Sequence, residues 1–445
     1  MPLPRSGLRG LLTMGLYQPL FALVFLLYSP VLLWRLLCNR NGQRTSMRER
    51  MGFVPRRADA ERPLVWIHGV SVGEVKAASN FVTELRRRLP DVELVISTTT
   101  PNGRLVAQQE YPDLQVVTYP LDLMSFPARA LDRLRPRCVL LMELEIWPNF
   151  LQAARKRDIP VAVINGRISE RTFRGYRLAR GLLPQLDLIS KYCVQDAAYE
   201  RRLLELGVDA ARVFVTGNMK YDSVVMHDHK DAAVELRSWL APGEQRVLVA
   251  GSTHGDEEQL VLRAAAHAQS QIGADVRVVL VPRHPERAAA ICEVVRDAGA
   301  RPVRWSEVAG ALPELASDDV VVVDTIGQLQ RFYAACDVAY VGGSLVPHGG
   351  QNMLEPAAQE RAVLFGPHTD NFQRDVELLL AADAVVQVPD REAFPEALAS
   401  LLGAPELCRQ YGRRARAVIS RNQGATLRTL DLVVDLVAEG APLQH

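Results

Sequence analysis

Short apolar runs rich in β-branched residues alternate with segments of helical spacing through the first half of the chain. The apolar runs predict strands at 64–67, 92–97, 115–119, 138–142, 160–165, 188–194 and 213–217. The segments between them predict helices at 75–88, 102–110, 128–135, 149–157, 170–183 and 197–206. Strands that alternate with helices of this length are typical of a parallel, doubly wound sheet. This half is therefore expected to form one Rossmann-like α/β domain that ends near Gly217.

The same alternation starts again after a polar helical segment at 228–243. It predicts strands at 246–250, 276–281, 320–323, 338–341, 362–365 and 385–388. The predicted helices are 257–271, 285–298, 329–335, 353–359, 372–381, 393–402, 406–421 and 425–439. We expect a second Rossmann-like domain, with the two sheets facing a central cleft, because ligand sites prefer domain interfaces. The expected divisions are 1–44, 45–227 and 228–445, and whether the terminal helices pack back on the first domain stays open.

An uncharged, apolar stretch from Gly10 to Trp34 precedes the first predicted strand. A membrane-spanning helix needs about 20 such residues, and the stretch is too long for a signal peptide and lacks a small-residue cleavage site. It therefore predicts a single N-terminal membrane anchor within 1–44. Pro19 and Pro30 would kink a spanning helix, so an insertion into the membrane interface stays an alternative.

Basic residues are more frequent after this stretch than before it, which predicts that the main body lies on the cytoplasmic side. They are Arg35, Arg40, Arg44, Arg48 and Arg50 after the stretch, against Arg5 and Arg9 before it.

Charge and motif content exclude several function classes. The 52 lysines and arginines nearly balance the 51 aspartates and glutamates, so there is no electrostatic case for nucleic-acid binding. The six cysteines are scattered without a CxxC pair, so neither a zinc site nor a disulfide framework is predicted. The chain contains neither G-x-G-x-x-G nor G-x-x-x-x-G-K-[ST], which argues against a dinucleotide-binding fingerprint and a P-loop.

The turn at 68–74 leads from a predicted buried strand into a helix. Its glycines, Gly69 and Gly73, let the backbone bend sharply, and Glu74 falls in the first helical turn, where the helix dipole favours a carboxylate. A lone glutamate at this position is usually only a helix-start acid. In open α/β folds, however, ligands bind beside the carboxyl ends of parallel strands, so we interpret Glu74 as a candidate general base.

Other strands of the first half also end in polar turns. Glu143 and Glu145 follow a strand predicted to be buried, where carboxylates without partners would cost roughly several kcal/mol. Thr98 and Thr99 lie at an equivalent strand end, and alone they would be ordinary helix caps. Lys220 follows the last strand of this half, where it could reach a leaving phosphate. Together these turns predict a polar floor at one edge of the sheet.

The second half carries turns typical of phosphate binding. The turn at 249–257 enters a helix through glycine and hydroxyl residues, and its Thr253 and Asp256 have capping-box spacing. In the turn at 281–285, two prolines hold Arg283 and His284 at a strand end. A guanidinium there suits a phosphate, although it could also make an ordinary surface salt bridge.

Two Gly-Gly pairs, a histidine and an acid fall close together between 342 and 356. Glycine-rich turns permit close backbone approach to a ligand, and Asn352 is expected to begin a helix whose free N–H groups can bind a phosphate. Glu355 is then placed for a ribose hydroxyl pair. This turn predicts nucleotide binding.

Five blocks together closely resemble the 3-deoxy-D-manno-octulosonic acid (Kdo) transferases of Gram-negative bacteria. They are 68–74, 143–148, 217–222, 281–285 and 342–356, and the resemblance runs in order from the apolar N-terminal stretch to about Phe372. It implies a GT-B glycosyltransferase that moves Kdo from CMP-Kdo to a lipid A precursor, lipid IVA, at the cytoplasmic face of the bacterial inner membrane. It also implies inversion of the anomeric centre, with no bound metal and no cofactor.

The resemblance also implies roles for individual residues. Glu74 is similar to the family's general base, and Lys220, with either Glu143 or Glu145, to its transition-state stabilisers. On the acceptor side the implied residues are Ser71, Gly73, Thr98 and Thr99. Gln328 stands where relatives often carry an acid, so a contact there is expected through the backbone. The implied CMP-Kdo-binding residues are Gly251, Ser252, Pro282, Arg283, His284, Ile326, Gly327, Gln328, Gly343, Ser344, Asn352, Met353, Leu354 and Glu355.

The chemistry of Kdo transfer agrees with these residues. In an oxocarbenium-like transition state, carboxylates stabilise positive charge on the sugar, while Arg283, Lys220 and helix N-termini can stabilise negative charge on CMP. Two alternatives stay open: a membrane-associated GT-B transferase that uses a UDP-sugar, and a non-catalytic lipid-A-binding protein with a degenerate transferase fold. The intact Glu74, Lys220 and Arg283 argue against the second. The number of Kdo units added, the oligomeric state and the extent of domain closure have no motif in the sequence.

Overall fold

The computed structural model describes residues 43–57, 61–123, 125–178, 184–224 and 230–439. The predicted membrane anchor at 10–34 lies outside these residues. None of the described helices is both long and apolar enough to cross a bilayer. The described residues form two compact units: those up to Ser223 together with those from Gln423 onward make the first, and Val224–Asn422 make the second.

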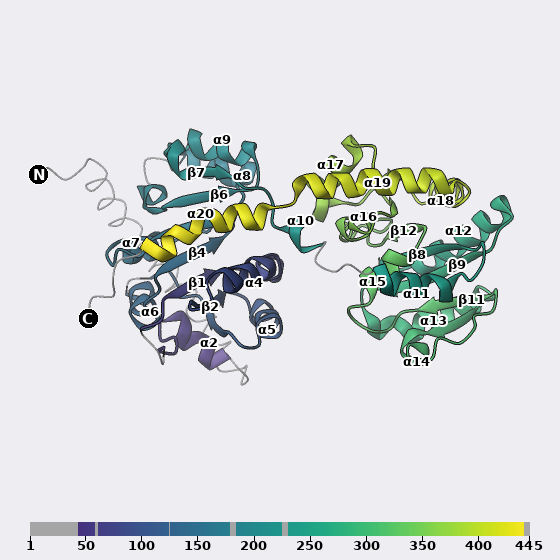
Figure 1. The fold of residues 1–445 in the computed structure, drawn as a ribbon, viewed down its shortest axis with the longest axis horizontal. Coiled ribbons are helices and arrows are strands. Elements are labelled where there is room, and N and C mark those ends of the chain that lie inside the picture. Colours follow the sequence, from purple (N-terminus) through teal and green to yellow (C-terminus); the bar gives the residue numbers. More distant parts are fainter. Residues whose placement is uncertain (1–42, 58–60, 124, 179–183, 225–229, 440–445) are drawn as a thin grey trace, which may run out of the picture. The chain divides into compact units, whose positions relative to one another are not determined.

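The first unit is built on seven parallel strands in the order β3-β2-β1-β4-β5-β6-β7 (Figure 1). The strands are β1 (Leu64–His68), β2 (Glu93–Thr98), β3 (Gln115–Thr118), β4 (Cys138–Met142), β5 (Val161–Gly166), β6 (Lys191–Val194) and β7 (Val213–Val215). The helices of this unit that precede the second unit in the chain are α2 (Gln43–Arg50), α3 (Val72–Ala77), α4 (Ser79–Arg88), α5 (Pro101–Glu110), α6 (Phe126–Leu134), α7 (Pro148–Arg155), α8 (Glu170–Leu178), α9 (Ala197–Glu205) and α10 (Lys220–Ser223). The strand order reverses between β1 and β4, which is where such sheets hold ligands.

Apolar side chains cover both faces of this sheet. Along β1, Val65 and Ile67 join one buried cluster, whereas Leu64 and Trp66 join another. Successive side chains of a strand point to opposite faces. Because both faces are buried, the strands form unbroken apolar runs rather than an alternation of apolar and polar residues, and this is the signal that the sequence carries.

The second unit has its own seven-stranded parallel sheet, in the order β10-β11-β9-β8-β12-β13-β14 (Figure 1). The strands are β8 (Arg246–Thr253), β9 (Val276–Pro282), β10 (Arg301–Arg304), β11 (Asp319–Val322), β12 (Val338–Val341), β13 (Ala362–Phe365) and β14 (Val386–Gln387). The helices are α11 (Lys230–Leu240), α12 (Glu257–Ile272), α13 (Ala288–Asp297), α14 (Trp305–Val308), α15 (Leu329–Ala335), α16 (Leu354–Ala358), α17 (Gln373–Ala381), α18 (Phe394–Leu402) and α19 (Pro405–Asn422). The prediction of two doubly wound parallel sheets is confirmed.

The sequence pattern missed the edge strand β10. Its residues are not apolar: Arg301 and Arg304 are exposed and pair with Asp319 and Asp324. An edge strand has one neighbour, and here it contains Pro302, which cannot donate to a ladder. The pattern therefore lacked the hydrophobic run by which the buried strands were recognised.

The last two helices belong to different units. Helix α19 packs on α16 and β13, whereas α20 (Ala425–Glu439) packs on α4, β5 and β6 of the first unit (Figure 1). Asp222 ties the start of α20 to α10, because its carboxylate accepts hydrogen bonds from the N–H groups of Gly424 (2.6 Å) and Thr426 (2.7 Å). Val433 and Leu430 then complete an apolar cluster of the first sheet.

Asp222→Ala should loosen α20 from the first unit. Removing a helix N-cap of this kind costs about 1–2 kcal/mol, so amide hydrogen exchange along α20 is expected to rise about 5- to 30-fold. Mass-spectrometric exchange measures this directly. Asp431→Ala is the matched control, because Asp431 is an exposed residue of the same helix that makes a surface ion pair with Arg88. Equal exchange in both variants would contradict the role of Asp222.

Candidate active site

Glu74 is held at the start of α3 by hydrogen bonds to both of its carboxylate oxygens. Oε2 accepts from the Val70 N–H (2.8 Å) and Oε1 accepts from the Ser71 hydroxyl (2.8 Å). Ser71 is also the N-cap and accepts from the Glu74 N–H (3.4 Å). Glu74 is thus a helix-start acid, as its position suggested, and its half-buried carboxylate is fixed in orientation.

Three threonines hold this turn against the end of β2. The hydroxyls of Thr98, Thr99 and Thr100 all donate to the Val70 carbonyl, at 3.1, 3.3 and 3.4 Å. The Thr98 side chain is fully buried, so its hydroxyl supports the turn and is not offered to a substrate. Thr99 is half-buried and stays a candidate for acceptor contact, together with the exposed Gly73.

His68, at the end of β1, is a structural residue. Its ring is fully buried, stacks on Tyr119 with centroids 3.8 Å apart, and contacts Ser97 through Nδ1. Burial lowers the pKa of His68 to about 3. The imidazole is therefore neutral at physiological pH and is not poised to exchange protons with a ligand.

Glu143 and Glu145 follow β4 at the same edge of the sheet. Glu143 has a left-handed backbone (φ 58°) and receives a hydrogen bond from Arg167 Nε (2.8 Å). Glu145 receives one from Trp147 Nε1 (2.8 Å). A left-handed conformation at a residue other than glycine stores backbone strain, and such strain clusters at functional sites. The partners that two carboxylates need at this depth are therefore present, in Arg167 and Trp147.

Electrostatic repulsion connects these carboxylates with Glu74. Burial raises the pKa of Glu145 to about 7, against the hydrogen bond from Trp147, and the charges of Glu74 and Glu143 raise it further. Burial also raises the pKa of Glu143, Arg167 opposes this rise, and Glu74 adds to it. The structure thus brings Glu74, Glu143 and Glu145 into one electrostatic group, as catalytic sites often do.

Lys220 lies beyond β7 at the start of α10. Its N–H is capped by the Asn218 side chain (3.0 Å), and the preceding Met219 N–H donates to Asn165 Oδ1 (3.1 Å). Asn165, the next-to-last residue of β5, has a left-handed conformation (φ 52°) and lies two residues before Arg167. These contacts attach the Lys220 segment to the same strand ends, while a direct role for the ammonium stays a prediction.

In the second unit, the glycine-rich turns are organised by the buried carboxylate of Glu257. Oε1 accepts hydrogen bonds from Tyr340 Oη (2.7 Å) and from the N–H groups of Ser344 (3.1 Å) and Leu345 (3.0 Å). Oε2 accepts from the N–H groups of His254 (2.9 Å) and Gly343 (2.7 Å). Glu257 is 0% exposed. One carboxylate therefore fixes the turns after β8 and β12 to each other.

These two turns approach each other so closely that side chains are excluded. A Cβ atom on Gly342 would lie 2.5 Å from the Ser252 carbonyl oxygen. Gly343 (φ 67°) and Ser252 (φ 53°) are both left-handed. The Ser344 hydroxyl is fully buried, where it donates to the Val341 carbonyl and accepts from the Gly366 N–H. Ser344 thus holds the loop, because its hydroxyl, its N–H and its carbonyl all bond other residues of the protein.

Cationic and imidazole groups gather above these turns. The His254 ring lies against His348 (centroids 4.1 Å apart) and His284 (5.8 Å). Burial lowers the pKa of His254 to about 4, and His348, His284, Arg287 and Arg283 lower it further. The Arg283 guanidinium is exposed and makes no hydrogen bond or ion pair with another described residue. Such a group of donors is suited to an anionic ligand.

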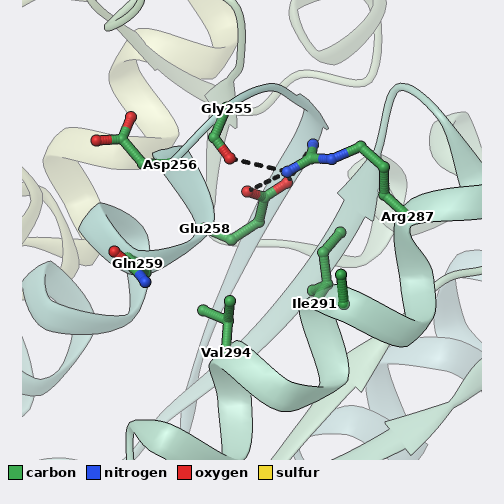
Figure 2. Close-up of a pocket in the computed structure, with 8 residues that line it drawn as sticks. Gly255, Asp256, Glu258, Gln259, Arg287, Ile291 and Val294 are labelled. Atoms are coloured by element: carbon green, nitrogen blue, oxygen red, sulfur yellow. Dashed lines mark hydrogen bonds and ion pairs between the residues drawn. The ribbon is translucent and has the colours of Figure 1, made fainter.

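Arg287, beside this group, forms hydrogen bonds that hold the turn after β8. Figure 2 shows its guanidinium reaching the Glu258 carboxylate (3.0 and 3.1 Å) and the Gly255 carbonyl (2.8 Å). The Thr253 hydroxyl donates to Glu258 as well (2.7 Å). The expected capping box of Thr253 with Asp256 is therefore wrong, because Thr253 bonds Glu258 and Asp256 pairs with Arg391 instead.

The turn at 348–356 differs in part from expectation. Helix α16 is only five residues long, and its first N–H, from Leu354, already bonds the Asn352 side chain (3.2 Å). Asn352 Nδ2 also donates to Glu355 (3.0 Å). Met353 and Leu354 are fully buried core residues. Of the four donor-binding residues predicted in this turn, the accessible polar ones are thus the half-buried Asn352 and Glu355.

The remaining predicted donor-binding residues lie at neighbouring strand ends. Pro282 ends β9, and Gly251 lies within β8, where a Cβ atom would overlap Tyr333. Ile326 is 87% exposed, and Gly327 has a left-handed backbone, in the loop between β11 and α15. The Gln328 side chain accepts a hydrogen bond from Arg331 (2.9 Å), and a ligand contact through its backbone stays a prediction.

Sequence reasoning assigned no individual role to several residues that shape the site of the second unit. His254 and His348 each stand beside a glycine in turns that had been singled out, and this adjacency was an available signal. Asn371 fixes the 348–350 turn through the carbonyls of His348 (3.1 Å) and Gly350 (3.3 Å). Glu257 could not have been found, because four of its five donors come from a turn over 80 residues away or from Tyr340.

Comparisons with known proteins show which proteins this chain is similar to. The family model described as 3-deoxy-D-manno-octulosonic-acid transferase (kdotransferase) matches residues 45–223. The chain is 33% identical over 404 residues to a 3-deoxy-D-manno-octulosonic acid transferase of Bordetella pertussis, covering 86% of this chain and 91% of that protein. It is 31% identical over 393 residues to a 3-deoxy-D-manno-octulosonic acid transferase of Haemophilus influenzae, covering 88% and 91%.

A solved glycosyltransferase of Rickettsia africae ESF-5 is similar in fold. It is 12% identical, covers 86% of this chain and all of its own, and has a TM-score of 0.53. At this identity the likeness concerns the fold alone. With the two parallel seven-stranded sheets, it supports a two-domain GT-B fold.

Glu257→Gln should lower the denaturant concentration at which the second unit unfolds. An amide in place of the carboxylate leaves N–H groups of the turns facing an NH2 group, and breaking a buried charged network costs about 3–5 kcal/mol. Urea unfolding followed by hydrogen exchange at 343–345 measures the loss. Glu293→Gln, an exposed glutamate that pairs only with Arg296, should change stability by about 0.5 kcal/mol or less. A similar small effect in both variants would show that Glu257 is not the anchor.

Glu145→Gln should change the pH dependence of stability. In the folded protein the pKa of Glu145 is about 7, whereas in the unfolded chain it is near its ordinary value of about 4.3. Between these values the folded state binds the proton more tightly, so wild-type stability falls as pH rises through the interval. The stability of the variant relative to wild type should therefore increase from pH 4.5 to pH 8. Parallel denaturation curves check this, with exposed Glu293→Gln as the control variant. A relative stability that fell with pH would contradict the assignment.

Proposed function

Since the chain belongs to the family of 3-deoxy-D-manno-octulosonic acid (Kdo) transferases, we propose that it moves Kdo from CMP-Kdo to a lipid A precursor and releases CMP. Glu74 acts as the general base for the acceptor sugar hydroxyl. The first unit supplies the acid–base groups, and the second unit supplies the groups that bind the nucleotide phosphate. The uncharged N-terminal stretch supports attachment to the bacterial inner membrane, with the catalytic units on the cytoplasmic side.

The observation that carries this proposal is the group of three carboxylates at one edge of the first sheet. Glu74, Glu143 and Glu145 lie close enough for their charges to raise the pKa of the latter two. Such a group of like charges is unfavourable for stability. Helix capping explains the presence of Glu74 but not that of Glu143 and Glu145. An oxocarbenium-like transition state, by contrast, gains from nearby negative charge. The arrangement therefore supports glycosyl transfer better than passive binding of a lipid.

The second unit supports a nucleotide monophosphate as the leaving group. The exposed Arg283 and the imidazoles of His284 and His348 surround a turn whose backbone N–H groups are fixed by Glu257. A guanidinium in this position can stabilise the negative charge that develops on the phosphate. Asn352 and Glu355 are available for the sugar of the nucleotide.

The proposed reaction is a single displacement. Glu74 takes the proton of the acceptor hydroxyl while the hydroxyl oxygen attacks the anomeric carbon of Kdo. The bond between that carbon and the phosphate oxygen breaks, its electron pair leaves with CMP, and the anomeric centre is inverted. The hydrogen bonds from Val70 and Ser71 orient the carboxylate and occupy only part of its roughly four lone-pair sites, so the carboxylate can still receive the proton.

The donor and acceptor are tested together by mass spectrometry of the lipid product. Incubation of the full-length protein with lipid IVA and CMP-Kdo should add the mass of one or more Kdo units, whereas incubation with a UDP-sugar should leave lipid IVA unchanged. Transfer from the UDP-sugar alone would replace the proposal with the UDP-dependent alternative. Absence of transfer from both donors, with lipid IVA still bound, would favour a non-catalytic protein.

Glu74→Gln should abolish turnover while preserving the fold of the turn. The amide oxygen can still accept a hydrogen bond from Val70 or Ser71, but the side chain cannot take a proton, and general bases contribute about 10²–10⁴-fold to rate. We expect kcat to fall by that factor with CMP affinity unchanged by calorimetry. Glu84→Gln, at a half-buried residue of α4 that pairs with Arg87, should keep wild-type turnover. Near-normal turnover of the Glu74 variant would remove it from the base role.

A further inference from the structure

The second unit contains a cavity at the edge of its sheet opposite the glycine-rich turns. Its fourteen lining residues belong to α11, α15, α16 and α19 or to the segments that follow α15 and α16. Asp337 immediately precedes β12 and Arg361 immediately precedes β13, so the cavity lies at the amino ends of these strands. Gly342 and Gly366 follow the carboxyl ends of the same strands. The cavity is therefore separate from the residues to which the proposed reaction assigns a role.

Arginine is the dominant residue of this cavity. The five that line it are Arg237, Arg361, Arg409, Arg413 and Arg416. Arg237 pairs with Asp337 (2.7 Å), and both Arg409 (2.7 Å) and Arg413 (3.1 Å) pair with Glu406. Within the described part of the chain, Arg361 and Arg416 have no carboxylate partner. Even with Glu360 counted, positive charge is in excess.

Helix capping explains part of this concentration. The Arg361 guanidinium donates to the Cys336 carbonyl (3.2 Å) at the end of α15, and Arg416 donates to the Ala358 carbonyl at the end of α16. Cations stabilise the negative ends of helix dipoles. Each guanidinium has five N–H donors, however, and capping uses few of them. The Nε atom of Arg361 is buried without any hydrogen-bond partner in the described residues.

We propose that this cavity binds a phosphate-bearing anion, either a free organic phosphate or the phosphate of a lipid headgroup. Guanidinium groups bind phosphate in a bidentate manner, and arginine is preferred over lysine where such planar recognition matters. A dianion would satisfy the donors that capping leaves over and would neutralise the excess charge. The site is independent of the proposed Kdo transfer and would stand if that proposal failed.

The first test is calorimetric titration of pyrophosphate into the full-length protein in neutral detergent, with CMP present at saturation so that the glycine-rich turns are occupied. Arg413→Gln and Arg416→Gln should each weaken binding about tenfold, the effect of one charge-assisted hydrogen bond. Arg421→Gln is the matched control, because Arg421 is exposed on the same helix, α19, and does not line the cavity. Arg413 is exposed and, among the residues that the structure describes, bonds only Glu406, so its loss should leave the fold intact.

The second test distinguishes the source of the phosphate. Flotation compares the same variants on vesicles of phosphatidylcholine with and without phosphatidic acid. Pyrophosphate binding that weakens in the two cavity variants supports the site with a free anion as ligand. Absence of pyrophosphate binding, with loss of the phosphatidic acid dependence in the cavity variants only, supports the site with a headgroup as ligand. The proposal is overturned if the cavity variants match Arg421→Gln in both measurements.

Discussion

The buried carboxylate of Glu257 is the interaction on which the proposed donor-binding unit depends. Its five hydrogen bonds are all accepted at one end of α12, and four of the donors are backbone N–H groups of the turns after β8 and β12. Those turns carry left-handed residues and glycines that tolerate no side chain, so they would not keep this conformation without a common acceptor. A charge at 0% exposure is normally expensive, and here the number of its donors offsets its desolvation.

The first unit also holds its turn through one common acceptor, but this acceptor is of a different kind. There the common acceptor is a backbone carbonyl, that of Val70, which receives three threonine hydroxyls from the end of β2. This contact fixes the turn before α3 and leaves the Glu74 carboxylate at the surface of the sheet edge. Both units thus present chemistry at the carboxyl ends of parallel strands, but one presents carboxylates and the other presents guanidinium and imidazole groups. A reaction that separates positive from negative charge requires such a division.

Much of this arrangement could be read from the sequence, for a definite physical reason. Strands buried on both faces leave unbroken apolar runs, and a turn that must bend sharply or approach another backbone leaves glycines; the sheets and the positions of Glu74, Glu143 and Arg283 follow from these signals. The edge strand β10 is polar and contains neither an apolar run nor a glycine. Long-range partners leave no local signal either, so the roles of Glu257 and Ser344 were hidden. The buried Met353 and Leu354 show the opposite error, since a turn that contains ligand-binding groups also contains residues that only pack.

The capping role of Glu74 and its proposed catalytic role do not compete. A carboxylate that only capped α3 would need no other acid nearby, and the neighbouring Glu143 and Glu145 raise the electrostatic cost of the whole edge, as the raised pKa of Glu145 records. Carboxyl groups whose pKa is raised by burial and by neighbouring charges cluster at functional sites. The hydrogen bonds from Val70 and Ser71 fix the direction of the Glu74 carboxylate before a substrate binds. A mobile side chain would have no such fixed direction. Capping is thus the means by which this fold orients the proposed base.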